Sequence, residues 1–257
     1  MILRRITEHV KAQNWTAVAL DFVIVVVGVF IGIQVSNWNA ARTDRKIEAQ
    51  YLARLHQELS EMSPQADAGF ETAKTRHARI IQVKNYFESG KGGDMLDGEH
   101  CAAIMRSHIY AGVIFYPPTI KELISTGRIV LIRDNALRTA ILSFDQANEE
   151  ITQLRTDIQI GRLLLARHYP ELVALGLSEW EESRCEFALM AANQAFLNDF
   201  TDNRHRYEAF ANAVLGRQSE MIKSLGENVA ASRGVVFAPT RDAAHDGSSD
   251  DNDRRAQ

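Results

Sequence analysis

From Phe22 to Ala41 the chain carries no charged residue, and this stretch constrains the fold more than any other part of the sequence. It begins FVIVVVGVFIGI, and with its uncharged neighbours the apolar run reaches about 20 residues, enough to cross a hydrocarbon core about 30 Å thick. Trp15 and Trp38 flank the run, at the depth where tryptophans of membrane proteins meet the lipid–water interface. The sequence therefore predicts one transmembrane helix over residues 16–38.

Two other interpretations of the apolar run were weighed. A cleaved signal peptide would be followed by a site with small residues, whereas the sequence QVSNWN follows here. A buried core helix of a soluble domain is the second alternative. We interpret the run as an uncleaved anchor.

The orientation of this anchor depends on its flanks. Residues 1–15 form a short segment, which favours an N-terminus in the cytoplasm and residues 39–239 on the other side of the membrane. The basic residues that set orientation are nearly balanced between the two sides. They are Arg4, Arg5 and Lys11 before the helix and Arg42, Arg45 and Lys46 after it.

The predicted transmembrane helix also carries small residues at every fourth position, Gly28, Gly32 and Ser36. On a helix they lie along one face, where a second helix can approach closely enough for the backbones to pack. Asp21 lies seven residues before Gly28 and projects from nearly the same face. The pattern indicates a helix–helix contact in which Asp21 bonds to a partner. The alternative is that glycine is simply frequent in membrane helices and that Asp21 marks the interface.

The rest of the chain has the pattern of an all-α domain with at most a short strand pair. Fifteen glycines and five prolines in 257 residues are few, which fits long helices. Apolar residues recur at three- and four-residue spacing in several stretches. We expect a juxtamembrane stalk helix from about residue 47, interrupted at Pro64 and continuing to about residue 87. Further helices are expected at 99–112, at 119–127 with Thr119 and Glu122 as a capping box, at 135–168 and at 194–233, and a disordered acidic tail at 240–257.

The two cysteines, Cys101 and Cys185, permit one disulfide if the domain is exported, or else two buried thiols. The net charge of −4 gives no reason to expect nucleic-acid binding. The chain has no GxSxG, HExxH or CxxC motif, and we expect neither a catalytic residue nor a cofactor. His100 and His108 have a poor spacing for metal ligands, so no metal site is predicted. The segment YAGVIFYPPT, residues 110–119, could line a ligand groove, although packing against the helices is the simpler interpretation.

The N-terminal block HVKAQNWTAVALDFVIVVVGVFIGIQVSNWN resembles the opening of an uncharacterised bacterial family of single-pass membrane proteins, a domain of unknown function. The later block ELISTGRIVLIRDNALRTAIL resembles a second recurring part of such proteins. Together the two blocks cover about a quarter of the chain. The resemblance implies a bacterial protein of the inner membrane, with its domain in the periplasm, and carries over no catalytic residue.

Taken together, these features predict a non-enzymatic envelope protein of interaction or structural type. Its partners would be the lipid bilayer and, through the Gly28–Gly32 face, a second copy or another membrane protein. A ligand-binding sensor that acts through a partner is the first alternative, since only the short segment 1–15 lies on the other side of the membrane. An envelope hydrolase, whose catalytic groups would come from distant segments, is the second.

Overall fold

The computed structural model describes residues 15–240, and side chains from residue 19 onward. The predictions for residues 1–14 and for the tail from residue 241 onward lie outside the described residues. The chain divides into two compact units, Met1–Gln50 and Tyr51–Gln257. The fold class is the predicted one, because the described part consists of helices and one antiparallel pair of two-residue strands.

Helix α2 spans Trp15–Ser89, and the predicted boundary at residues 38 and 39 falls within it. The predicted interruption at Pro64 is wrong, because the helix continues through this proline. Proline has no N–H, so the carbonyl of Ser60 lacks its usual partner within the helix. The backbone N–H of Thr240 donates to this carbonyl over 3.0 Å. A segment from the far end of the described chain thus satisfies the group that the proline leaves free.

The second unit contains the remaining elements, among which β1 and β2 pair with Val173 opposite Cys185. In chain order the elements are η1 (Gly93–Met95), α3 (Gly98–Met105), α4 (Pro118–Ser125), η2 (Arg128–Leu131), α5 (Asn135–Gln159), α6 (Leu165–His168), β1 (Val173–Ala174), η3 (Trp180–Glu182), β2 (Arg184–Cys185), α7 (Phe187–Ala192), α8 (Gln194–Ala209), η4 (Phe210–Gly216) and α9 (Arg217–Arg233).

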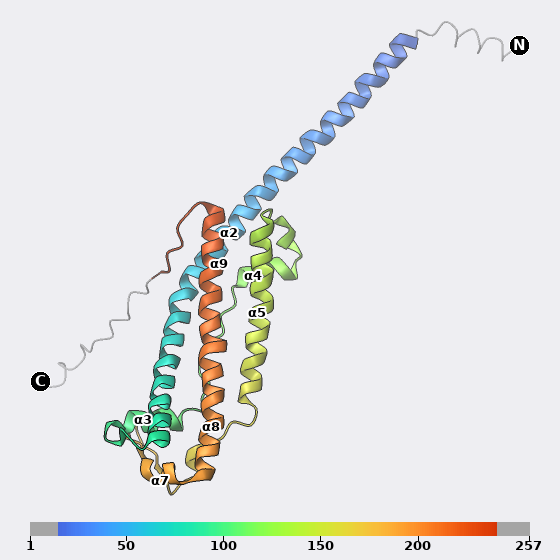
Figure 1. The fold of residues 1–257 in the computed structure, drawn as a ribbon. Coiled ribbons are helices and arrows are strands. Elements are labelled where there is room, and N and C mark those ends of the chain that lie inside the picture. The colour runs from blue at the N-terminus through green and yellow to red at the C-terminus, as the bar shows by residue number, and fades with distance from the viewer. Residues whose placement is uncertain (1–14, 241–257) are drawn as a thin grey trace, which may run out of the picture. The chain divides into compact units, whose positions relative to one another are not determined.

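The last long helix has the predicted bounds, because α8, η4 and α9 follow one another without a break from residue 194 to 233. The seven residues of η4 are π-helical, which the periodicity did not indicate. Within the second unit this helix packs on one side against α5 and on the other against α2, where Ser219 bonds to Asp67 (Figure 1). The three long helices form the body of the domain, and α3 and α7 lie at one end of it (Figure 1).

Two predicted helices are shorter than expected. The helix predicted for residues 135–168 ends at Gln159, and the short α6 follows separately. Gly161 has φ +73°, a left-handed conformation that ends a helix readily because glycine has no Cβ. The helix predicted for residues 99–112 ends at Met105, with Arg106 as its C-cap.

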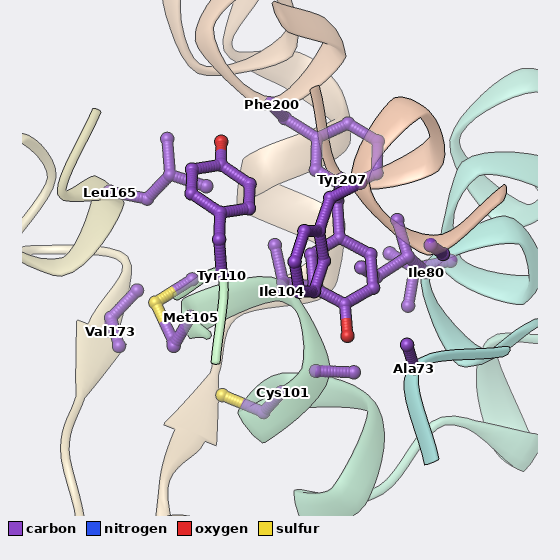
Figure 2. Close-up of a cluster of buried hydrophobic side chains, with 14 of the residues drawn as sticks. Ala73, Ile80, Cys101, Ile104, Met105, Tyr110, Leu165, Val173, Phe200 and Tyr207 are labelled. Carbon is purple, nitrogen blue, oxygen red and sulfur yellow. The ribbon is translucent and has the colours of Figure 1, made fainter. Parts of the chain in front are cut away.

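The core of the domain joins side chains from α2, α3 and α8 (Figure 2). Tyr207 is 1% exposed, and its ring stacks on Tyr110 with 6.5 Å between centroids. Phe196 and Phe200 stack on each other and meet Phe87 edge to face. Aromatic rings bury much apolar surface at little conformational cost, so this cluster fixes the end of the bundle that carries α3.

A short C-terminal strap, residues 234–240, turns back after α9. Gly234, at φ +67°, allows the turn, and the N–H of Val235 donates to the carbonyl of Ala230 over 3.0 Å. The ring of Phe237 meets His56 of α2 edge to face at 5.9 Å. At Gly226 of α9 a Cβ atom would lie 2.3 Å from the Phe237 ring, so only glycine leaves room for it.

Candidate functional site

The predicted helix-packing face lies in the first unit, on the part of α2 that is apolar and long enough to cross a membrane. An added Cβ at Gly28 or Gly32 would meet no atom within 4 Å. Asp21 and Ser36 are exposed as well. The large apolar side chains between Leu20 and Trp38 are 48–69% exposed. This face is therefore not covered by any part of the chain that the structure describes.

Cys101 and Cys185 are joined by a disulfide, with 5.5 Å between their Cα atoms. Cys101 lies in the middle of α3 and is 1% exposed, whereas Cys185 ends β2. The bridge closes a loop of 84 residues. It ties α3 covalently to the segment that includes η3 and β2. Gly98, at the start of α3, packs against this segment so closely that a Cβ would lie 2.0 Å from the carbonyl oxygen of Glu181.

His100 and His108, the two histidines of the metal-ligand type in this region, do not lie in a metal site. His100 completes the capping box of α3, with its Nδ1 2.7 Å from an Asp97 carboxylate oxygen. Its Nε2 lies 2.6 Å from the side-chain oxygen of Gln82. His108 is half-buried, and burial lowers its pKa. Within residues 15–240 no group of three metal-ligating side chains comes together.

A polar network fastens the start of α4 to α2, and it corrects the predicted capping box. The helix α4 begins at Pro118, so Thr119 lies inside it and is not the N-cap. The side chain of Thr119 is buried. The carboxylate of Glu58 in α2 accepts hydrogen bonds from the Thr119 hydroxyl at 2.7 Å and from its N–H at 3.1 Å. The cap is thus supplied by α2, 61 residues away, which no local sequence signal could indicate.

The same network continues through Glu122, which was predicted to serve the capping box. Its carboxylate accepts a hydrogen bond from the Tyr51 hydroxyl at 2.6 Å and another from Arg54. The hydrogen bond from Tyr51 lowers the pKa of Glu122 most, and the hydrogen bond from Arg54 is the next largest cause. Arg128 donates to the Tyr51 oxygen over 2.7 Å. The network contains two arginines, Arg54 and Arg128, and two carboxylates, Glu58 and Glu122. It is therefore balanced in charge, as expected of a structural contact.

The segment at residues 110–119 packs against the helices. Tyr110 is in the core, and Gly112 lies so close to Leu215 that a Cβ would be 3.0 Å from that side chain. The buried side-chain amide of Gln218, in the orientation that satisfies both its groups, donates to the carbonyl of Val113 and accepts from the N–H of Phe115. The segment thus has a packing role, the simpler of the two interpretations.

An open groove of about 370 Å³ lies between α5 and α9. Phe144 and Leu225 form apolar parts of its wall, and Arg217 and Glu220 are its charged groups. Arg217 is paired with Glu150 at 2.8 Å. The groove has the size of a small-molecule site, but it is open and has few convergent polar groups.

No protein-family model matches the chain, and no curated protein or solved structure is similar to it. The functional conclusions therefore depend on the residues and their geometry.

Proposed function

We propose that the protein is a bacterial membrane-anchored envelope protein without enzymatic activity, which associates with a second copy or another membrane protein through the Gly28–Gly32 face. The observation that supports this most directly is the open surroundings of both glycines. In a membrane, where lipid is as apolar as the helix, close backbone packing at small residues is a main source of helix association. An uncovered face of this kind is suited to a partner helix.

The proposed topology has the N-terminus in the cytoplasm and the domain in the periplasm of the inner membrane. The Cys101–Cys185 disulfide supports this orientation, because disulfides form and persist in the periplasm and are rare in the cytosol. The apolar segment, exposed along its whole described length, supports insertion into lipid.

The test is cross-linking of the full chain in bacterial membranes, with the double variant Gly28→Leu, Gly32→Leu. Two leucines on the face would keep a partner backbone away, so we expect association to weaken by at least about tenfold, or about 1.4 kcal/mol. Val23→Leu is the matched control, because residue 23 lies on the opposite side of the helix. It adds apolar volume and should leave the cross-linked fraction unchanged.

The result that would contradict the proposal is equal association of the double variant and the parent chain. The thermal stability of the domain, measured in the same preparations, separates loss of contact from loss of folding. A stable domain with lost cross-links supports the proposal, and mass spectrometry of the cross-linked species then distinguishes self-association from another partner.

A ligand-binding sensor that acts through a partner is the second candidate, and the groove between α5 and α9 is the observation that favours it. A small molecule that remains bound to the purified chain and is lost on changing Ser143→Trp, which would fill the groove, would favour this candidate over the first.

A further inference from the structure

One arginine lies where the sequence pattern places core residues. Arg76 is on the inward face of α2, three residues after Ala73 and four before Ile80, which are 4% and 0% exposed. Its guanidinium lies over the ring of Tyr207, 5.5 Å from the centroid. Figure 2 shows the three neighbours Ala73, Ile80 and Tyr207 in one cluster. Arginine is rarely placed against a core unless its charge has a partner.

The partners of Arg76 within the described chain are neutral. Its guanidinium donates to the carbonyl of Ile109 at 3.5 Å and lies over the ring of Tyr207. No carboxylate of residues 19–240 is within ion-pair distance of it. Burial first, and then the positive charges of Arg106 and Arg79, lower the pKa of Arg76. A desolvated cation next to two further cations is unfavourable unless an anion offsets it.

The two neighbouring arginines are only partly matched by carboxylates. Arg79 forms an ion pair with Glu99. Arg106 lies over the ring of Trp180 at 5.7 Å and is 3.9 Å from a carboxylate oxygen of Glu181, at the limit of an ion pair. Its Nε is buried and has no hydrogen-bond partner. Arg76 and Arg106 are joined through Ile109, whose carbonyl accepts from Arg76 and whose N–H donates to the carbonyl of Arg106 over 2.9 Å. Within residues 19–240 the three guanidinium groups have two carboxylate partners, Glu99 and Glu181, and the Nε of Arg106 has no acceptor.

The elements that hold these groups are fixed relative to one another. Arg106 is the C-cap of α3, and Trp180 and Glu181 belong to η3. The Cys101–Cys185 disulfide links α3 to the strand that follows η3. A site whose donors are held in place before binding loses less conformational entropy on binding.

We propose that Arg76, Arg79 and Arg106 form a binding site for a phosphate group. Planar guanidinium groups match phosphate oxygens with paired hydrogen bonds, and an anion here would supply both the missing charge and the missing acceptors. The site is accessible, because the side chains of Arg79 and Arg106 are 37% and 30% exposed. The phosphate can be free or carried by a lipid or other small molecule. This inference is independent of association through the anchor.

The test is calorimetric titration of the full chain, purified in a maltoside detergent that contains no phosphate, with inorganic phosphate at constant ionic strength. We expect saturable binding, weakened by at least about tenfold in Arg76→Gln and in Arg106→Gln, because each removes a charged donor. Arg76→Lys, which keeps the charge but lacks the planar fork, should also bind more weakly. Lys84→Gln is the matched control, since it removes one positive charge from a partly exposed ion pair with Glu88 on α2.

Binding of phosphate by the parent chain and by Lys84→Gln, but not by Arg76→Gln or Arg106→Gln, supports the site. Absence of binding by the parent chain, or equal binding by all variants, overturns it, and so does equal competition by acetate, which would indicate general screening. Should Arg76→Gln fail to fold, as judged by circular dichroism, the partly exposed Arg106→Gln decides. A second titration with dihexanoyl phosphatidic acid distinguishes the sources, since tighter binding than for inorganic phosphate indicates a lipid.

Discussion

The two glycines of the apolar segment and two glycines of the domain, Gly98 and Gly226, have opposite surroundings. Around Gly28 and Gly32 an added Cβ would find open space, whereas at Gly98 and Gly226 it would lie within 2.3 Å of another part of the chain. Gly98 and Gly226 are therefore needed for packing within the domain. Gly28 and Gly32 have no such role in internal packing. The domain is therefore expected to fold by its own contacts, and the apolar segment to depend on lipid or on a partner. Changes in the two regions should accordingly have separable effects.

The largest effect should come from the disulfide, which belongs to the domain side of this comparison. In the chain-entropy model, removing a bridge between cysteines 84 residues apart costs about 4.6 kcal/mol. We expect Cys101→Ser, Cys185→Ser to lose roughly this much stability in denaturant unfolding. Cross-linking through the anchor should not change. A reducing agent should destabilise the parent chain and leave the double variant unaffected, and equal stability of the two chains would contradict the prediction.

A smaller effect is expected at Gly98, where the crowding involves backbone atoms. The Cβ of Gly98→Ala would meet the carbonyl of Glu181, so α3 and η3 must separate, at a cost of about 2–3 kcal/mol. Gly69→Ala is the control, because nothing lies within 4 Å of its Cβ position in α2. Alanine favours helix, so this change should stabilise the domain by about 0.5–1 kcal/mol. Thermal unfolding of both variants checks the opposite signs.

The smallest effect concerns three half-buried histidines of the domain, His56, His77 and His108. Burial, the first cause in each case, lowers their pKa values, and each has a buried ring nitrogen without a hydrogen-bond partner. The unfolded chain, with histidine pKa values of about 6.5, then binds protons more readily than the folded one. Their contribution to stability is therefore complete above about pH 6.5 and is lost as the pH falls through the lowered values.

Urea unfolding at about pH 7.5 and at about pH 5.5 checks this dependence. The triple change of these histidines to glutamine should reduce the loss of stability on acidification, whereas His205→Gln, on an exposed residue, should not. The charged groups around the three histidines are Arg233 for His56, Glu208 and Arg204 for His77, and Arg162 for His108. An unchanged pH dependence in the triple variant would assign the effect to these or other groups.

The parts of the fold that depend on local pattern could be predicted from the sequence. The helix from residue 194 to 233 follows from its apolar periodicity, and Cys101 and Cys185 were the only pair available for a disulfide. The errors at Pro64 and at the Thr119–Glu122 capping box share one cause, a partner from a distant segment. Pro64 stays within a helix because Thr240 bonds to the carbonyl of Ser60.

The candidate sites divide in the same way. The small-residue face is a repeat within one helix, so the sequence alone identifies it. The sequence does not identify the arginine cluster, because Arg76 and Arg106 come from different elements and are brought together only by folding. The only signal in the sequence is that Arg76 stands at a core-facing position of α2, between the buried residues Ala73 and Ile80. Apolar periodicity alone does not tell whether a charged residue at such a position has a function.

The bond between Thr240 and Ser60 determines how force would enter the domain. The C-terminal strap leaves α9 at Gly234, yet its last described residue is fastened to α2 at the turn that contains Pro64. The ring of Phe237 in the strap lies against both helices, beside His56 of α2 and Gly226 of α9. Mechanically, a load on the strap would therefore be shared by α2 and α9, two helices that are far apart in the sequence.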